Sequence, residues 1–345
     1  MEKNIKGKLF KKDDNKINPN SKNSKFKMVK HLRIMKESIE KAFILQDGNL
    51  LAYYNGNILI YDKNDFSIKN KYKITLNGYI DEMIQLPNGK VACCLKWPPN
   101  FWGSRIIILD ISNNNIEQNQ VLKPIFQGKF INILGSLLNW ELVLSEVGFC
   151  EFFALKNKKF VLKEKIQFKD HFFALNLFEI ERDKILFNGC YDSIKNFRED
   201  HYCLKKVILI YDISNNKKEL LFKVDPIKEY RFANIKPILL NNKCLVYIKS
   251  DKPYGLVVFD IKYREFVTIV CSKNQIIISC ITKLSENLVL VGDYNGYVTL
   301  YCFENNKFFE LTTEKLTKKI YKISKFNEKK FYFIDEKIIK IYEII

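Results

Sequence analysis

The chain has 345 residues, of which 47% are hydrophobic, so it can form one large all-β domain or two ordinary domains around a sizeable core. It has no apolar run of about 18 residues and no apolar segment near Met1, which argues against a transmembrane helix and a secretory signal. We therefore expect an intracellular protein of the cytoplasm or the nucleus. The net charge of +18 comes from dispersed Lys residues, which is typical of a solvated basic surface; weak binding of nucleic acid or of anionic membrane is the alternative.

Residues 1–27 are rich in Lys and Asn, contain few aromatic residues and show no periodicity. That composition is typical of a disordered arm. Residues 1–30 carry a charge of +7, so the arm is either a targeting or nucleic-acid-binding tail or an unselected flexible segment. We expect residues 28–345 to form a single domain.

An apolar strand recurs along this domain, and its clearest copies end in an aromatic residue, or Leu109, followed by Asp. The steps between the seven copies range from 41 to 58 residues when the aromatic residue, or Leu109, is the marker. A period of this length predicts a repeat architecture such as a β-propeller. The copies lie at 58–62, 106–110, 150–154, 207–212, 256–260, 298–302 and 339–343.

A second marker, a tight turn between two apolar strands, gives the same count. Asn-Gly and Asp-Gly suit such turns because both central positions accept a positive φ. Each unit is therefore expected to have four short strands, called a, b, c and d in chain order. The turns between strands a and b fall at Asp47-Gly48, Asn88-Gly89, Asn139-Trp140, Arg182-Asp183, Asn241-Asn242, Glu286-Asn287 and Asn327-Glu328.

The last unit lacks a strand d, because the chain ends two residues after Glu343. Residues 30–34 precede the first turn much as residues 70–74 precede the second: Ile34 lies 13 residues before Asp47, and Ile74 lies 14 before Asn88. We therefore expect the N-terminal strand to complete the last blade. The predicted fold is an all-β, seven-bladed propeller that the N-terminal strand closes, which protects the edges of the last sheet.

The repeat resembles that of the WD40 family of β-propellers over residues 29–345. The Tyr-Asp, Phe-Asp and Leu-Asp endings of strand c take the place of the family's Trp-Asp dipeptide, and residues 292–298 look like its segment between strands b and c. The chain has only three His residues and no Gly-His dipeptide, so the family's Asp–His–Ser network is absent. The resemblance is thus to a divergent member, and it implies an interaction platform.

Two connections between strands b and c are long. Residues 96–105 of blade two hold Trp97, Phe101, Trp102 and Arg105 together with two Pro residues. Exposed aromatic side chains on a rigid loop are good anchors for a partner, but packing against the edge of the blade explains them as well.

The second long connection is residues 191–205 of blade four, with Tyr191, Arg198 and His201. Its mixed charges are typical of a solvated loop. Connections between b and c, and between d and a, emerge on one face of a propeller. That face is therefore the predicted surface for a protein partner.

No P-loop, GxSxG, HExxH or Gly-rich phosphate loop is present, so we expect no enzymatic activity, no cofactor and no small-molecule substrate. Cys190, His201 and Cys203 lack a fourth ligand, so we predict free or structural thiols and no metal site. The carboxylates at the ends of strand c repeat with the blades, which indicates caps of turns. They are Asp62, Asp110, Asp212 and Asp260.

The sequence thus favours a non-enzymatic scaffold that binds protein partners. The alternative is recognition of phosphoinositide or another anionic lipid, which some seven-bladed propellers achieve with a Phe-Arg-Arg-Gly motif on blade five. The corresponding residues 262–266 lack the double Arg. Nucleic-acid binding through the basic arm would be weak and non-specific, because the surface is poor in Arg.

Overall fold

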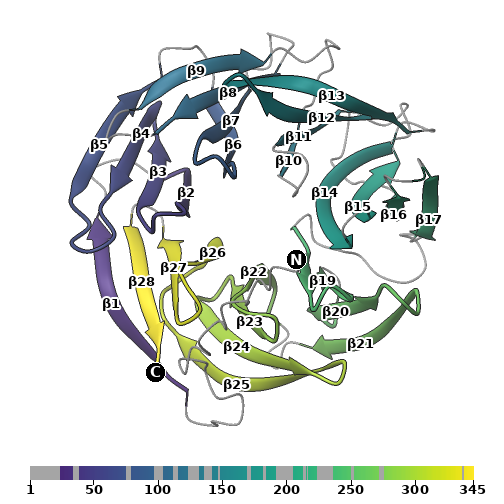
Figure 1. Ribbon diagram of the computed structural model, residues 1–345. Coiled ribbons are helices and arrows are strands. Elements are labelled where there is room, and N and C mark those ends of the chain that lie inside the picture. The colour runs from purple at the N-terminus through teal and green to yellow at the C-terminus, as the bar shows by residue number, and fades with distance from the viewer. Residues whose placement is uncertain are drawn as a thin grey trace, which may run out of the picture.

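The computed structural model describes residues 24–33, 39–74, 79–96, 104–111, 116–122, 132–135, 142–146, 148–168, 172–181, 184–191, 205–212, 215, 217–223, 236–249, 252–271, 276–335 and 338–345. In these residues, 28 strands form seven four-stranded antiparallel sheets. Figure 1 shows the sheets as the blades of a ring, with the first strand of each sheet nearest to the axis. The predicted all-β, seven-bladed propeller is confirmed.

Each of blades one to six takes four consecutive strands, in the order a to d from the axis outward. Blade one has β2 (Lys41–Ile44), β3 (Leu50–Tyr54), β4 (Asn57–Tyr61) and β5 (Ile68–Lys73), and blade two has β6 (Tyr79–Gln85), β7 (Val91–Lys96), β8 (Ser104–Asp110) and β9 (Glu117–Leu122). Blade three has β10 (Asn132–Gly135), β11 (Leu142–Glu146), β12 (Phe149–Lys156) and β13 (Lys159–Gln167), and blade four has β14 (Phe172–Glu181), β15 (Lys184–Tyr191), β16 (Lys205–Asp212) and β17 (Lys217–Lys223). Blade five has β18 (Ile238–Leu240), β19 (Cys244–Lys249), β20 (Gly255–Asp260) and β21 (Glu265–Cys271), and blade six has β22 (Ile278–Lys283), β23 (Leu288–Asp293), β24 (Tyr297–Glu304) and β25 (Lys307–Lys315).

Blade seven combines both ends of the chain. It has β26 (Lys322–Lys325), β27 (Lys330–Asp335), β28 (Ile338–Ile344) and, outermost, β1 (Phe26–Arg33). The predicted closure by the N-terminal strand is therefore confirmed. The strand begins at Phe26, so Phe26 and Lys27 belong to the blade, which differs from the expected boundary at residue 28.

The predicted a–b turns lie where expected in the five blades whose turns the structure describes; Asn139-Trp140 and Arg182-Asp183 lie outside the described residues. Gly48 and Gly89 have φ values of 86° and 84°, and Asn241 and Asn242 have values of 50° and 51°. Only glycine and, at some cost, asparagine adopt this left-handed region readily, which explains the residue types at these turns.

Three of the four Asp residues at the ends of strand c are shown to cap turns. Asp62 Oδ1 accepts a hydrogen bond from the Asn64 amide at 2.7 Å, and Asp260 Oδ1 accepts from the amides of Lys262 and Tyr263 at 2.8 and 3.0 Å. Asp212 Oδ1 accepts from the Asn215 amide at 3.2 Å. This confirms the predicted role at these positions. Asp110 forms an ion pair with Lys90 at 3.1 Å, and most of the turn that follows it lies outside the described residues.

A bulge recurs between strands c and d of all seven blades. In blade one, Tyr61 pairs with Ile68 and Ile60 with Asn70, so Lys69 has no partner in the register. Blade seven repeats this on the N-terminal strand: Tyr342 pairs with Met28 and Ile341 with Lys30, which leaves Val29 as the extra residue. β1 therefore has the geometry of strand d and not merely its place.

The bulge also corrects the marker of blade four. It lies at Leu209, whereas Tyr211 was the expected equivalent of Tyr61. Strand c of this blade thus continues two residues further before its Asp cap. The Tyr211-Asp212 ending therefore looks like the repeated ending of strand c, but it lies two residues after the equivalent position.

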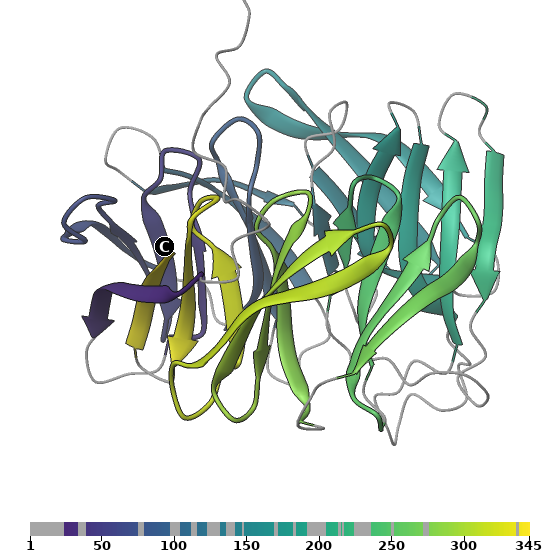
Figure 2. The same ribbon diagram turned by 90° about the horizontal axis from the view of Figure 1, so that it is seen from below.

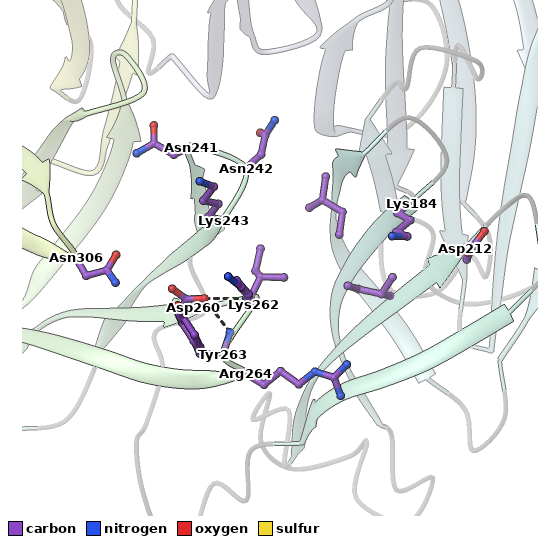
Figure 3. A pocket seen from close by; sticks show the side chains of 13 residues that line it. Lys184, Asp212, Asn241, Asn242, Lys243, Asp260, Lys262, Tyr263, Arg264 and Asn306 are labelled. Atoms are coloured by element: carbon purple, nitrogen blue, oxygen red, sulfur yellow. Dashed lines mark hydrogen bonds between the residues drawn. The ribbon is translucent and has the colours of Figure 1, made fainter.

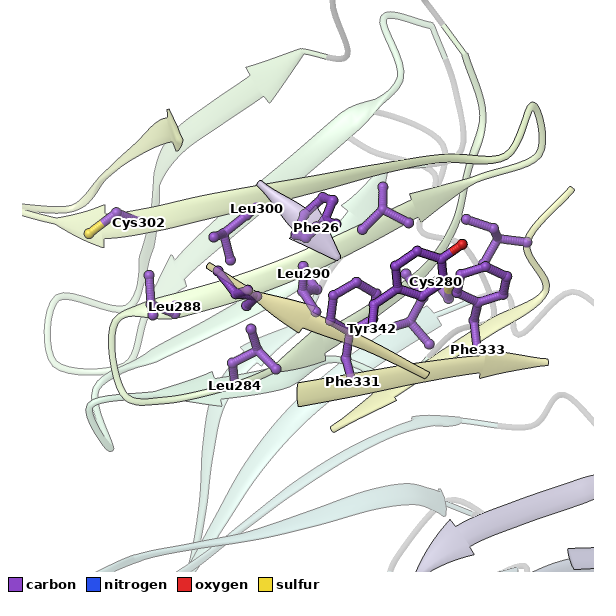
Figure 4. Packing of buried hydrophobic residues seen from close by; sticks show 14 residues of the cluster. Phe26, Cys280, Leu284, Leu288, Leu290, Leu300, Cys302, Phe331, Phe333 and Tyr342 are labelled. Atoms are coloured by element: carbon purple, nitrogen blue, oxygen red, sulfur yellow. The ribbon is translucent and has the colours of Figure 1, made fainter. Parts of the chain in front are cut away.

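The core lies between neighbouring blades, where the side chains of two sheets interdigitate. Figure 4 shows the cluster between blades six and seven, into which Phe26 of β1 projects. The Phe26 ring packs edge-on against Phe331 with centroids 5.2 Å apart, and its amide donates to Glu314 Oε1 of blade six at 2.8 Å. The N-terminal strand is thus held by both the last and the penultimate blade.

Buried tyrosines add hydrogen bonds between blades. The Tyr332 hydroxyl of blade seven donates to the Ala42 carbonyl of blade one at 3.0 Å, and the Tyr247 hydroxyl of blade five donates to Asn188 Oδ1 of blade four at 3.0 Å. Burial raises the pKa of both phenols. They therefore remain neutral donors at any physiological pH.

Gly296 lies in the b–c turn of blade six, at a φ of 85°. Asp293 Oδ1 accepts from the amides of Asn295 and Tyr297, and the Gly296 carbonyl accepts from the Leu316 amide at 3.0 Å. A Cβ at Gly296 would lie 1.8 Å from the Thr317 carbonyl oxygen. Only glycine fits where this turn meets the connection to blade seven.

Phe26→Ala should lower the free energy of unfolding by about 3 kcal/mol, because it leaves a cavity where β1 is anchored. Met28→Ala on the same strand is the matched control, since Met28 is 52% exposed, and it should cost less than about 0.5 kcal/mol. Urea unfolding followed by circular dichroism measures both. Equal effects of the two substitutions would show that β1 is not anchored through Phe26.

Gly296→Ala should destabilise the protein more than Gly89→Ala by about 2 kcal/mol or more, because only the first adds a steric clash to the unfavourable φ. The φ values of the two glycines are 85° and 84°, and a Cβ at Gly89 would meet nothing within 4 Å. The difference between their thermal midpoints isolates the clash. Similar midpoints would contradict the close contact at Thr317.

Candidate functional site

The antiparallel order of each sheet assigns the loops to two faces. Because strand direction alternates from a to d, the a–b and c–d turns lie at one end of every blade, and the b–c and d–a connections lie at the other. We call these ends the turn face and the connection face. Figure 2 shows the ring from the side, with hairpins at both ends of the blades.

A pocket of about 860 Å³ opens on the turn face between blades four and five, and we call it the turn-face pocket (Figure 3). Its volume is within the range of about 300–1,000 Å³ that is usual for ligand sites. Its walls come from blade four, from both turns of blade five and from the c–d turn of blade six. The polar lining is Lys184, Asp212, Asn241, Asn242, Lys243, Asp260, Lys262, Tyr263, Arg264 and Asn306.

Cations outnumber carboxylates in this lining by four to two. Asp260 is 5% exposed, and its carboxylate accepts from two amides of its own turn, so these dipoles offset part of its charge. In Figure 3, the side chain of Arg264 extends from blade five toward blade four. The pocket therefore has a positive potential and suits an anionic ligand or partner.

The turns of blade five present these groups on a fixed backbone. Asn241 and Asn242 form the a–b turn at positive φ, and the Asn241 amide donates to Glu286 Oε2 of blade six at 2.8 Å. Glu286 is in turn paired with Lys283 at 2.6 Å. Arg264, at a φ of 59°, ends the c–d turn, and its amide donates to the Asp260 carbonyl at 2.9 Å.

Among the aromatic residues that the structure describes, Tyr263 is the most exposed, at 63%. It lies at the tip of the c–d turn of blade five. The Lys262 ammonium group lies 5.3 Å from the centroid of its ring. An exposed tyrosine beside cations can bury its ring against a partner while the hydroxyl stays hydrated.

Cys244 lies behind the pocket wall, and its thiol is 3.8 Å from Asn306 Oδ1. Burial, with a smaller contribution from the Asp260 carboxylate, raises the pKa of this thiol to about 11. The thiol is therefore protonated near neutral pH and acts as a weak donor, since only the thiolate is a good nucleophile.

The structure places only two of the predicted partner-binding residues in strands. Arg105 is half-buried in β8 of blade two, where it pairs with Leu95, and Tyr191 is the last residue of β15 in blade four. Trp97, Phe101, Trp102, Arg198 and His201 lie outside the described residues, as does Cys203. The partner surface expected on the connection face therefore stays a prediction.

The turn-face pocket was missed at the level of sequence, although a signal for it existed. The a–b and c–d turns of one blade lie at the same end of its sheet, so Asn241-Asn242-Lys243 and Lys262-Tyr263-Arg264 had to meet on one face. Lysines are so common in this chain that their residue type alone did not mark the place.

Within the described ranges, no group of three or more His, Cys, Asp or Glu side chains is arranged to hold a metal ion. The same residues contain no helix long and apolar enough to cross a membrane. Comparison with known proteins finds no family model that matches the chain and no curated protein with significant similarity to it.

Asp260→Ala should lower the free energy of unfolding by about 2 kcal/mol, because two turn amides lose a charged acceptor in a buried setting. Asp260→Asn keeps an acceptor oxygen and should cost clearly less. Urea unfolding of both variants provides the comparison. If Asn costs as much as Ala, the carboxylate stabilises the turn by something other than these hydrogen bonds.

Proposed function

We propose that this protein is a non-enzymatic scaffold that binds protein partners, and that the turn-face pocket holds an acidic peptide segment of a partner. The observation that carries the proposal is the excess of cations around a preformed opening of about 860 Å³. A rigid ring offers several such surfaces at once, which suits assembly of larger complexes. The divergent resemblance to WD40 propellers supports the same role, because they mostly serve as interaction platforms.

The chemistry of the lining favours a peptide over a lipid headgroup. Asn241, Asn242 and Asn306 each offer a donor and an acceptor, which match the N–H and C=O groups of a peptide backbone. A phosphate or a phosphoinositide headgroup accepts hydrogen bonds at its charged oxygens and gains little from amide carbonyls. Lys243, Lys262 and Arg264 would then contact the acidic side chains of the peptide.

The aromatic residue at the rim supplies the apolar part of the interface. Tyr263 is exposed in the free protein, and a contact with a partner would bury its ring. Tyrosine and arginine are the side chains that most often dominate binding energy at protein interfaces. The connection face, with Trp97 and Trp102, is proposed as a second and independent partner surface of the same scaffold.

The test is binding of a fluorescent peptide of alternating Glu and Leu, followed by anisotropy at low and at physiological salt. Lys243→Glu with Lys262→Glu should weaken binding by at least about tenfold, because attraction becomes repulsion at the rim. Lys71→Glu with Lys73→Glu is the matched control: both residues are exposed on β5 of blade one and change the net charge equally. The control should bind nearly as the natural protein does.

Equal losses in both double variants would contradict the proposal, because binding would then follow net charge alone. A peptide with Lys in place of Glu should not bind. Vesicles of phosphatidylcholine with phosphatidylserine form a further arm. If the pocket variant loses vesicle binding and keeps peptide binding, the pocket recognises anionic lipid and the peptide proposal is wrong.

A further inference from the structure

Three charged residues occupy the same level of the innermost strands. Lys41 of β2, Glu82 of β6 and Lys322 of β26 pair with Tyr53, Cys94 and Ile334 on their respective b strands. On each b strand, this partner lies three residues after the residue that pairs with the last residue of strand a. Side chains from blades one, two and seven therefore reach the axis of the ring at one height.

A pocket of about 650 Å³ adjoins this level, and we call it the axial pocket. It is lined by the first strands of blades four to seven. Lys236 and Lys322 bring two ammonium groups to it, while Phe178, Leu239 and Tyr321 give it an apolar wall. Lys283 also lines the pocket, but its ammonium group is paired with Glu286.

The charges at the axis are close enough to influence one another. Loss of hydration raises the pKa of Glu82, against the opposing charges of Lys236, Lys41 and Lys322, while Asp81 adds to the rise. Lys322 is exposed to the axial space, yet the surrounding protein removes enough water to lower its pKa, and the charges of Lys41 and Lys236 lower it further.

Three ammonium groups thus face two carboxylates at a place that is partly removed from water. The positive charges of Lys41 and Lys236 disfavour the charged form of Lys322, and a bound anion would relieve this repulsion. Lys is expensive to desolvate unless it is paired, and the excess positive charge here has no protein counterion among these groups. Charges that oppose folding without improving the packing are typical of a binding site.

We propose that the axial pocket binds a small organic anion, whose charged group contacts Lys236 and Lys322 and whose apolar ring or chain lies against Phe178, Leu239 and Tyr321. The combination of two cations with an apolar wall excludes a bare inorganic ion as the best ligand. It equally excludes a neutral apolar ligand, which would leave the ammonium groups without a counterion. The inference is independent of the turn-face pocket, which lies at the ends of the strands on the turn face.

The first test is isothermal titration calorimetry with phenyl phosphate, inorganic phosphate and phenol. Phenyl phosphate should bind at least about tenfold more tightly than either of the other two, because only it satisfies both parts of the pocket. Benzoate and phenyl sulfate form further arms that distinguish carboxylate and sulfate from phosphate as the preferred charged group. Failure of every aromatic anion to bind better than inorganic phosphate and phenol would overturn the proposal.

Variants locate the binding. Lys322→Gln should weaken binding of the best aromatic anion by about tenfold. Glu82→Gln should tighten this binding, because the substitution removes a carboxylate that competes with the anion. Lys73→Gln on the outer strand of blade one changes the net charge equally and should leave the affinity unchanged. Thermal midpoints of all three confirm that they fold. Equal weakening by Lys322→Gln and Lys73→Gln would show that the anion binds through net charge and not at the axis.

The pH dependence gives a further readout. Phenyl sulfate keeps its charge over the working range, so changes in its affinity report on the protein. Because the pKa of Glu82 is raised, this carboxylate takes up a proton at a higher pH than an ordinary Glu, and binding should tighten as the pH falls. Because the pKa of Lys322 is lowered, this ammonium group loses its proton at a lower pH than an ordinary Lys, and binding should weaken as the pH rises. Glu82→Gln should abolish the acidic part of this profile, and an unchanged profile would contradict the assignment of the site.

Discussion

The antiparallel pairing of β1 with β28 is the interaction on which the ring depends. Without β1, blade seven would end at β28 and expose a row of unpaired backbone groups along one edge. The closure also joins residues at opposite ends of the chain: the Lys25 amide donates to the Ile345 carbonyl and the Ile345 amide to the Lys25 carbonyl, both at 3.0 Å. The axial pocket requires blade seven in place, because Tyr321 and Lys322 come from its first strand and connection. Closure is therefore a condition for the proposed axial site as well as for stability.

The blades are held together by two kinds of contact with different specificity. Apolar clusters between neighbouring sheets supply most of the burial, at about 25 cal/mol for each Å² removed from water, but the hydrophobic effect itself is non-directional. Hydrogen bonds between turns fix the alignment: Glu286 accepts from the Asn241 amide of the preceding blade, and Gln85 accepts from the Gln46 amide in the same way at 2.6 Å. The first of these bonds joins blades five and six at the turn-face pocket, so it helps to hold this side of the pocket in place without a ligand.

The sequence was sufficient for the fold because the fold is repeated. Strand c with its Asp cap and the Asn-Gly turns recur often enough that weak copies, such as residues 150–154, are identified by their spacing. The missing strand d of blade seven follows from the same count. The sites were harder to predict because each combines residues from different blades: Lys184 and Lys243 are far apart in sequence, and Lys41, Glu82 and Lys322 meet only once the ring is closed. Blade four shows the limit of pattern alone, since its Tyr211-Asp212 ending is displaced by two residues from the true bulge at Leu209.

The bulge in every outermost strand changes how the basic composition should be understood. The outermost strand of each blade is an open edge, and seven such edges on one molecule would invite pairing with strands of other molecules. An extra residue in each edge breaks the even spacing of amide and carbonyl groups that an incoming strand would need. Lysines reinforce this along the same strands, as in the run Lys69, Lys71 and Lys73 of β5. Part of the net charge of +18 thus opposes aggregation and is distributed around the circumference of the ring. The pockets proposed for recognition lie elsewhere, on the turn face and along the axis.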